Sequence, residues 1–245
     1  MAEFRLEIAG CVGHITSLFD STPHYFSKYL TDAPADFSAM VRPEDLVFEQ
    51  DELDREAREE GFKRRQFTDP FLERAAIQRA FANFLLPRQV LLVHGSAIAA
   101  DGKGYLFIAR SGTGKSTHTR LWQQLLTDRA VMINDDKPFV RFRDDGIFLC
   151  GSPWSGKHGL DSNISVPLAG ICLLERGSEN RIRPLPGDRR LEHLTQHSCP
   201  PADASLLPFF APLVQKLSLS VPMWQMACTK DPAAARMAFA AMTSL

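Results

Sequence analysis

The run Ala109-Arg110-Ser111-Gly112-Thr113-Gly114-Lys115-Ser116-Thr117 contains the residue types that bind nucleotide phosphates. It follows the apolar run 105–108 and opens a segment, 117–126, that reads as a helix. In a strand, glycine-bearing loop and helix start of this kind, backbone N–H groups and the helix dipole attract a phosphate. We therefore predict a nucleotide site made of seven residues: Ser111, Gly112, Thr113, Gly114, Lys115, Ser116 and Thr117.

Within this loop, Lys115 supplies a full positive charge for the β and γ phosphates, and the Ser116 hydroxyl is offered to Mg²⁺. The P-loop pattern has glycine at its first position, where this chain has Ala109, the smallest substitute. The competing interpretation is an ordinary glycine-rich turn. The strand-loop-helix context favours the phosphate loop.

Two carboxylates, Asp135 and Asp136, follow the apolar run 130–133. Either acid at such a strand end can hold Mg²⁺, directly or through water, so the candidate metal ligands are Ser116, Asp135 and Asp136. The other acid is close enough to take the proton from an attacking hydroxyl. The alternative is an acidic turn, because Asp-Asp before Lys-Pro is also good turn chemistry.

A loop at 151–159 combines three glycines, a proline, Trp154 and Lys157. It could close over phosphates, with Lys157 neutralising charge in the transition state; the alternative is a surface loop around a packed tryptophan. Arg181 and Arg183, on a predicted edge strand, are further candidate cations.

Composition sets the class of protein. The 245 residues are 44% hydrophobic and 23% charged, with a formal net charge of −1, which is ordinary for a globular protein. Nothing in this balance favours a nucleic-acid or membrane partner. Five scattered cysteines without a CxxC pattern argue against zinc and for a reducing, cytoplasmic location.

The elements that must position these residues divide the chain in two. Residues 1–48 alternate in short runs, which predicts a small β-rich lobe, and the acidic run 49–60 is interpreted as a solvated connector or helix face. We place the domain boundary so that 1–68 is this lobe with its connector and 69–245 is the nucleotide-binding domain. A helix from Asp69-Pro70 to near Pro87 is expected to pack beneath the P-loop sheet.

Downstream, apolar runs and turn residues predict the remaining elements. A strand is expected over 89–100, with a hairpin turn at 101–104 leading into the P-loop strand. Another hairpin is centred on 143–145. A further strand is expected at 167–174, an edge strand at 181–183, helices at 188–196 and 203–216, and a late strand at 219–228. An alanine-rich closing helix is expected from Asp231.

Taken in order, His94-Gly95-Ser96, the loop 111–117 and Asn134-Asp135-Asp136 resemble the C-terminal domain of HPr kinase/phosphorylase, over roughly residues 88–180. The resemblance implies an α/β protein with the P-loop core shared by HPr kinase and phosphoenolpyruvate carboxykinase. The length also resembles that of shorter relatives, among them the lasso-peptide precursor kinases.

By this resemblance, Asp136 is the proton acceptor, His94 lies near the reacting phosphate, and Lys115 and Ser116 bind phosphate and metal. The catalytic set is therefore Asp136, His94 and Lys115. The family has an acidic metal ligand where the stretch 163–171 has none. Asn163 or Ser165 could contribute weakly there, or Asp135 could substitute.

The expected activity is transfer of the γ-phosphoryl group of ATP, with Mg²⁺, to a hydroxyl. The partner is a peptide, a protein or a small-molecule acceptor, and a homo-oligomer is left open. Two alternatives from other classes stay open as well: a carboxykinase-like enzyme acting on a small molecule, and a non-catalytic binding module gated by nucleotide.

Overall fold

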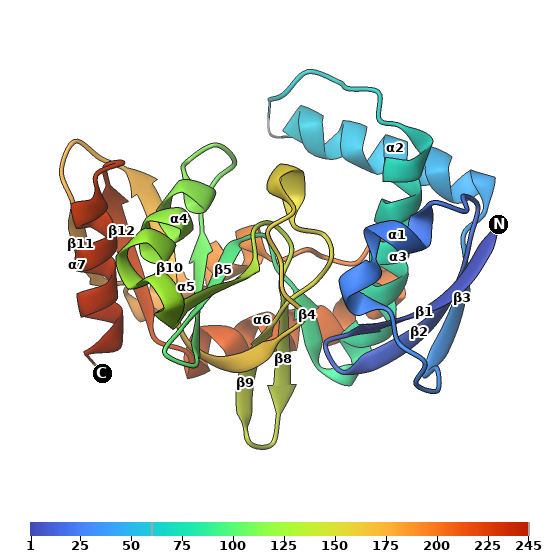
Figure 1. Cartoon of the computed structure of the whole chain (residues 1–245). Coiled ribbons are helices and arrows are strands. Elements are labelled where there is room, and N and C mark those ends of the chain that lie inside the picture. Colours follow the sequence, from blue (N-terminus) through green and yellow to red (C-terminus); the bar gives the residue numbers. More distant parts are fainter. Residues whose placement is uncertain (60, 245) are drawn as a thin grey trace. The chain divides into compact units, whose positions relative to one another are not determined.

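The computed structural model describes residues 1–59 and 61–244. Two compact units make up the chain, Met1–Leu85 and Leu86–Leu245, and Figure 1 shows the elements of each. The first unit contains a small sheet of three strands, and the second contains a much larger mixed sheet. The protein is therefore of the mixed α/β class, as the sequence predicts.

The first unit is built on the sheet β1-β2-β3, whose strands are Ala2–Ile8, Cys11–Ser17 and Phe37–Met40. A tight turn at Ala9 and Gly10, with φ of 50° and 71°, joins β1 and β2 into an antiparallel hairpin. Two short helical segments, α1 (Thr22–Tyr25) and η1 (Ser27–Tyr29), lead into β3, which pairs parallel to β2.

Two 17-residue helices complete this unit, α2 (Pro43–Glu59) and α3 (Asp69–Leu85). The aromatic ring of Phe37 on β3 stacks on Phe84 of α3, with centroids 4.2 Å apart. Arg79 of α3 pairs with Asp45 and Glu49 of α2 at 2.8 and 2.6 Å. Residues 49–59 of the acidic run are thus helical, and Glu49 among them faces α3.

One expectation about α3 needs correction. The sequence predicts this helix in the right place, but we expected it to pack beneath the P-loop sheet. It packs instead on the small sheet, where its Phe81 meets the ring of Phe37 edge-on at 5.0 Å. The compact units accordingly divide after Leu85, and not after residue 68.

The second unit is organised by a nine-stranded sheet in the order β4-β8-β9-β10-β6-β5-β7, with β12 beside β10 and β11 at the edge. The strands are β4 Val90–Leu92, β5 Ser96–Ala100, β6 Lys103–Ile108, β7 Ala130–Asn134, β8 Phe139–Arg143, β9 Gly146–Cys150, β10 Ser165–Arg176, β11 Arg181–Pro184 and β12 Met223–Cys228.

The long strand β10 joins two parts of this sheet. Its first residues, 165–167, pair antiparallel with β9, whereas its later residues pair parallel with β6 and with β12. Because β6, β10 and β12 run parallel, their carboxyl ends meet at one edge of the sheet, the edge where α/β proteins bind ligands. The phosphate loop follows β6 at this edge.

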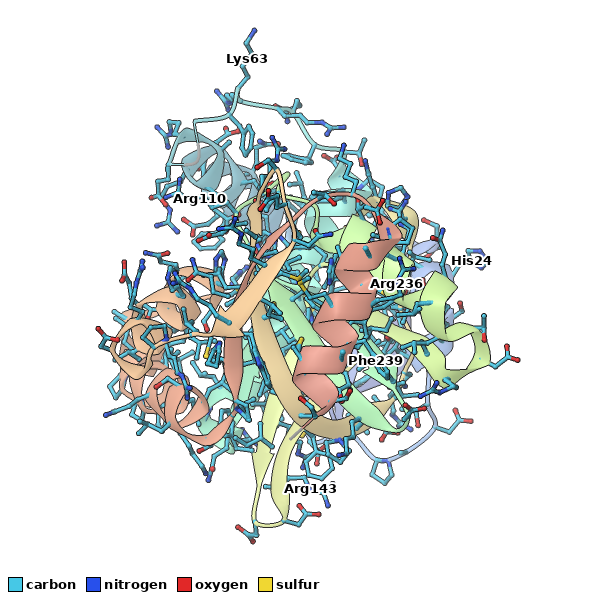
Figure 2. All side chains as sticks on the ribbon, turned by 90° about the vertical axis from the view of Figure 1, so that its left-hand side faces the viewer. His24, Lys63, Arg110, Arg143, Arg236 and Phe239 are labelled. Carbon is cyan, nitrogen blue, oxygen red and sulfur yellow. The ribbon has the colours of Figure 1, made fainter. Side chains whose placement is uncertain are left out.

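Helices cover both faces of the sheet, because alternate residues of its central strands point in opposite directions. Tyr105 and Phe107 of β6 point to the face covered by α4 (Lys115–Leu126) and α7 (Pro232–Thr243). Trp122 of α4 meets Phe239 of α7 there, with ring centroids 5.3 Å apart; Figure 2 labels Phe239 on its helix.

The neighbouring residues of β6, Leu106 and Ile108, point to the opposite face. That face is covered by α5 (Gly187–His197) and α6 (Leu207–Ser220). Short 3-10 turns complete the unit: η2 Leu86–Arg88, η3 Thr127–Arg129, η4 Gly156–His158 and η5 Ala204–Leu206. Arg143 lies at the tip of the β8–β9 hairpin (Figure 2).

The single strand predicted over 89–100 is in fact two strands, and this is a second correction. β4 pairs with β8, whereas β5 pairs with β6 and β7. The break falls at His94 and Gly95. A Cβ on Gly95 would lie 2.9 Å from the carbonyl oxygen of Phe107, so the chain approaches β6 too closely for a side chain there. None of the helices in the described residues is both long and apolar enough to cross a membrane.

Candidate functional site

The predicted phosphate loop has the backbone that its glycines allow. Gly112 and Gly114 have φ of +72° and +121°, values that favour glycine. Gly114 stands at the N-cap of α4 and Lys115 is its first residue. The first N–H groups of α4 therefore receive no side-chain cap from this position, and they point toward the loop.

Two cations bond to the loop's own carbonyl groups. The Lys115 Nζ donates to the carbonyl of Ala109 at 2.9 Å, and the Arg176 guanidinium donates to the carbonyl of Gly112 at 2.6 Å. Arg176 ends β10, beside β6, so the parallel pairing brings it to the loop. Ser111, Gly112 and Thr117 are exposed, whereas Thr113, Gly114, Lys115 and Ser116 are half-buried.

Asp135 is connected to the phosphate-loop helix by hydroxyl groups. The Ser96 Oγ donates to Asp135 Oδ1 at 2.6 Å and lies 2.9 Å from the Oγ1 of Thr119 on α4. Ser96, Thr119 and Asp135 are all buried. This hydrogen-bond chain fixes the end of β7 against the first turns of α4.

Asp136 lies beside His94. The distance from His94 Nε2 to Asp136 Oδ1 is 3.5 Å. Burial, followed by the positive charges of Lys137, Lys115 and His197, lowers the pKa of His94 to about 2. The imidazole is therefore neutral at pH 7 without nucleotide, and its contact with Asp136 is between a carboxylate and a neutral ring.

Asn134 holds the backbone of the two residues that follow Asp135. Its Oδ1 accepts from the backbone N–H groups of Asp136 and Lys137 at 2.8 and 2.7 Å, and its Nδ2 donates to the carbonyl of Ser152 at 2.8 Å. A side chain that closes a turn on its own following residues is the usual role of asparagine at a strand end. In the sequence, Asn134 stands in the motif with the two aspartates, but nothing there indicates this role.

A segment with no signal in the sequence, 197–199, lies along residues 92–94, where β4 ends. The His94 N–H donates to the carbonyl of His197 at 2.7 Å, and the Cys199 N–H donates to the carbonyl of Leu92 at 3.0 Å. Burial and the charges of Lys115, His193 and Arg110 lower the pKa of His197 to about 4. A histidine at the end of a helix gives no signal in the sequence that its carbonyl pairs with the backbone of His94.

The glycine-rich loop at 151–159 also reaches Asp136. A Cβ on Gly156, whose φ is +67°, would lie 3.4 Å from the Cβ of Asp136. Trp154 is buried, with its ring edge-on to Phe139 at 6.5 Å, so the loop is anchored by its tryptophan. The next residue after Gly156, Lys157, is exposed.

The remaining candidate cations lie on the edge strand. Arg181 pairs with Glu179 at 2.7 Å, and Arg183 donates to Gln225 at 3.2 Å. In the sheet, β11 is separated from β6 by β12 and β10. Three strand spacings amount to about 14 Å, so these arginines start far from the phosphate loop.

The residues considered as replacements for an acidic metal ligand, Asn163 and Ser165, are exposed near the start of β10. Another carboxylate, Asp161, comes closer to the aspartates: it forms an isolated bridge with Asn134 and accepts from the Ser155 hydroxyl at 2.9 Å. Within the described part of the chain, no three His, Cys, Asp or Glu side chains form a group that could hold a metal ion.

Comparisons with known proteins give distant similarities among solved structures. No family model matches the chain, and no curated protein matches it. Among solved structures, the HPr(Ser) kinase/phosphatase from Coxiella burnetii is similar, with a TM-score of 0.35 and 10% sequence identity. The match covers 62% of this chain and 92% of that chain. It is a distant similarity in fold.

Proposed function

We propose that this chain is an ATP-dependent kinase that transfers the γ-phosphoryl group of ATP to a hydroxyl, on a serine of a peptide or protein or on a small alcohol. One observation supports the proposal above the others. The hydrogen-bond chain Thr119–Ser96–Asp135 ties the phosphate-loop helix to the strand end that carries both aspartates. A nucleotide phosphate on the loop and a hydroxyl beside Asp136 would then be neighbours.

The loop supplies the nucleotide side of this site. The Lys115 ammonium is already within the loop, on the carbonyl of Ala109, and can exchange that carbonyl for a phosphate oxygen. The bare N-terminal N–H groups of α4 and the conformations of Gly112 and Gly114 suit an anion. We propose that Ser111 to Thr117 bind the phosphates of ATP.

The donors beside the loop fit a magnesium ion, which prefers oxygen ligands. We propose that the Ser116 hydroxyl and the carboxylates of Asp135 and Asp136 hold it, the rest of its ligands being phosphate oxygens and water. When bound, Mg²⁺ offsets the negative charge of the phosphates. The absence of a three-residue metal cluster among the described residues is compatible with this arrangement, because Ser116 contributes a hydroxyl.

We propose that Asp136 accepts the proton of the attacking hydroxyl. The acceptor oxygen forms a bond to the γ phosphorus as the bond from that phosphorus to the β–γ bridging oxygen breaks, and ADP leaves. Proton transfer to a positioned carboxylate contributes typically about 10²- to 10⁴-fold. The neutral His94 ring, 3.5 Å from Asp136, can orient this carboxylate without competing for its proton.

The motifs of the sequence, rather than the distant structural match, support a finer proposal. We propose that residues 86–245 form an HPr kinase-like P-loop core. The resemblance in sequence motifs covers the phosphate loop and the two aspartates, so it supports the phosphoryl donor better than the acceptor.

The replacement Asp136→Asn tests this function. We expect the variant to bind MgATP in titration calorimetry within about threefold of the wild type, and to lose at least about 100-fold in turnover. Turnover is followed by phosphorus NMR with fractions of cell-extract peptides and metabolites as acceptors. A matched control is Asp144→Asn, at the exposed β8–β9 turn, which should leave both quantities unchanged.

Two outcomes would contradict the proposal. If the wild type binds MgATP but no fraction supports turnover, a nucleotide-gated binding module becomes the better interpretation. If turnover persists at the wild-type rate in Asp136→Asn, the proposed base is wrong.

A further inference from the structure

Arg176 links the phosphate loop to the large sheet. Its guanidinium Nη2 donates to the carbonyl of Gly112 at 2.6 Å, across 64 residues of chain. Arg176 is the last residue of β10 and lies opposite Cys228 of β12. The N–H of the next residue, Gly177, donates to the carbonyl of Cys228 at 3.1 Å. The pairing with β12 therefore holds the backbone that carries this guanidinium.

The bond from Arg176 fixes a whole peptide unit of the loop. The peptide bond between Gly112 and Thr113 is trans, so its C=O and N–H groups lie in one plane and point in opposite directions. With the Gly112 carbonyl on Arg176, the Thr113 N–H points away from Arg176, and it donates to the carbonyl of Arg110 at 3.2 Å. Because Gly112 has no Cβ, its backbone has many other accessible conformations, and the bond to Arg176 selects this one.

The other side chain bonded to a carbonyl of the loop is not free to stay there when nucleotide binds. In the described residues this second bond runs from Lys115 Nζ to the carbonyl of Ala109, at 2.9 Å. In the proposed function Lys115 exchanges that carbonyl for a phosphate oxygen. The bond from Arg176 lies on the side of the peptide opposite to its N–H group, so a phosphate at that N–H does not displace it.

The carboxylates nearest to Arg176 in the sequence have partners of their own. Glu175 accepts from Gln225 at 2.7 Å, and Glu179 pairs with Arg181 at 2.7 Å. Arg176 is exposed, and its bond within the described residues is the one to the loop. Its position at the loop is therefore not a by-product of an ion pair elsewhere.

We propose that Arg176 is a positioning residue for ATP: by holding the Gly112–Thr113 peptide, it directs the Thr113 N–H to a phosphate oxygen. This inference rests on the proposed function. Arg176 acts through the loop backbone and does not itself contact the phosphates. It raises the fraction of the free protein whose loop is ready for nucleotide, and the apparent dissociation constant falls in proportion to that fraction.

Titration calorimetry with MgADP, which binds without turnover, measures the effect on the full chain. We expect Arg176→Met to weaken the binding of MgADP about tenfold, the usual order for a hydrogen bond from a charged group. Arg176→Lys keeps the charge and one donor, and it should recover part of the affinity. The matched control is Arg236→Met, which removes an exposed arginine of α7 that Figure 2 labels; it should bind MgADP as the wild type does.

The amide proton of Thr113 gives a spectroscopic signature that separates positioning from charge. In the wild type, saturating MgADP should shift this NMR signal downfield, because the N–H exchanges a long bond to the Arg110 carbonyl for a charged phosphate oxygen. In Arg176→Met at saturation, the shift should be much smaller. In Arg236→Met it should be complete. A loss of charge alone would weaken binding and leave the shift at saturation unchanged.

The outcomes distinguish this inference from the proposed function. Wild-type affinity for MgADP in Arg176→Met overturns the role of Arg176 and leaves the Asp136→Asn test as it stands. Weaker binding with a complete Thr113 shift, or equal weakening in Arg236→Met, also overturns it, because charge alone then accounts for the effect. If the wild type does not bind MgADP, the proposed nucleotide site itself is wrong. If Arg176→Met does not fold, Arg176→Gln, which is also uncharged, is measured in its place with the same outcomes.

Discussion

At the scale of single residues, the chemical type of a site residue was easier to predict than the residues to which it bonds. Lys115, Asp135 and Asp136 stand in motifs that are local in sequence, so their places at a loop and a strand end follow from the chain itself. Their partners do not. Ser96, Thr119 and His197 reach the site from three other elements, and each is an ordinary residue in its local context.

His118 gives a prediction about stability at this scale. Its side chain is 2% exposed on α4, against Phe107, and neither ring nitrogen has a hydrogen-bond partner among the described residues. Burial lowers the pKa of His118 to about 4. The unfolded chain therefore binds a proton more readily than the folded chain between pH 6.5 and about 4, and the free energy of unfolding falls as the pH is lowered through that range.

Replacing His118 by leucine should remove this contribution. Urea denaturation at pH 7.5 and pH 5 measures the free energy of unfolding in both proteins. We expect the loss between the two pH values to be about 2 kcal/mol smaller in His118→Leu than in the wild type. His197 is retained in both proteins and cancels in this difference. Equal losses would show that His118 has the same pKa in the folded and the unfolded chain, and would contradict the effect of burial.

At the scale of elements, the periodicity of the sequence predicted most helices and strands. β6 alternates between the two faces of the sheet, and α4 begins where the glycines of the loop end. The prediction failed where elements interact. The run 89–100 reads as one strand, but it is divided near Gly95, where the chain approaches β6 too closely for a side chain. The apolar stripe of α3 is genuine, yet a stripe does not specify which sheet will cover it.

The loop 151–159 gives a prediction at this scale. Gly156 and Gly159 both have positive φ, at +67° and +60°, but only Gly156 lies against Asp136. Gly156→Ala adds a methyl group that crowds this carboxylate, so we expect turnover to fall about tenfold or more at unchanged MgATP affinity. The measurement is a steady-state assay beside calorimetry.

Gly159→Ala is the matched control for this replacement. It imposes the same kind of backbone strain, but a Cβ there meets no atom within 4 Å. Equal effects of the two variants would mean that loop strain, and not contact with Asp136, determines turnover.

At the scale of the whole molecule, all the proposed site residues belong to one compact unit, 86–245. Hydrogen exchange with and without MgATP tests whether the nucleotide acts there. At a MgATP concentration 100 times its dissociation constant, amides of the loop 111–118 that exchange by opening of the site should slow by up to about 100-fold. Amides of β1 to β3 should exchange at unchanged rates. Slowing of similar size in both units would contradict a site confined to the second.

The sequence alone determined the mixed α/β class and the position of the glycine-bearing loop between β6 and α4, because these depend on local backbone preferences and on alternation along a single strand or helix. The tertiary structure decided which side chains meet. The parallel pairing of β6 with β10 brings Arg176 to the loop, the Ser96 hydroxyl joins β7 to α4, and the segment after α5 lies against His94. These contacts join residues that are far apart in the chain. The spacing of residues along the chain does not indicate which strands pair across a sheet.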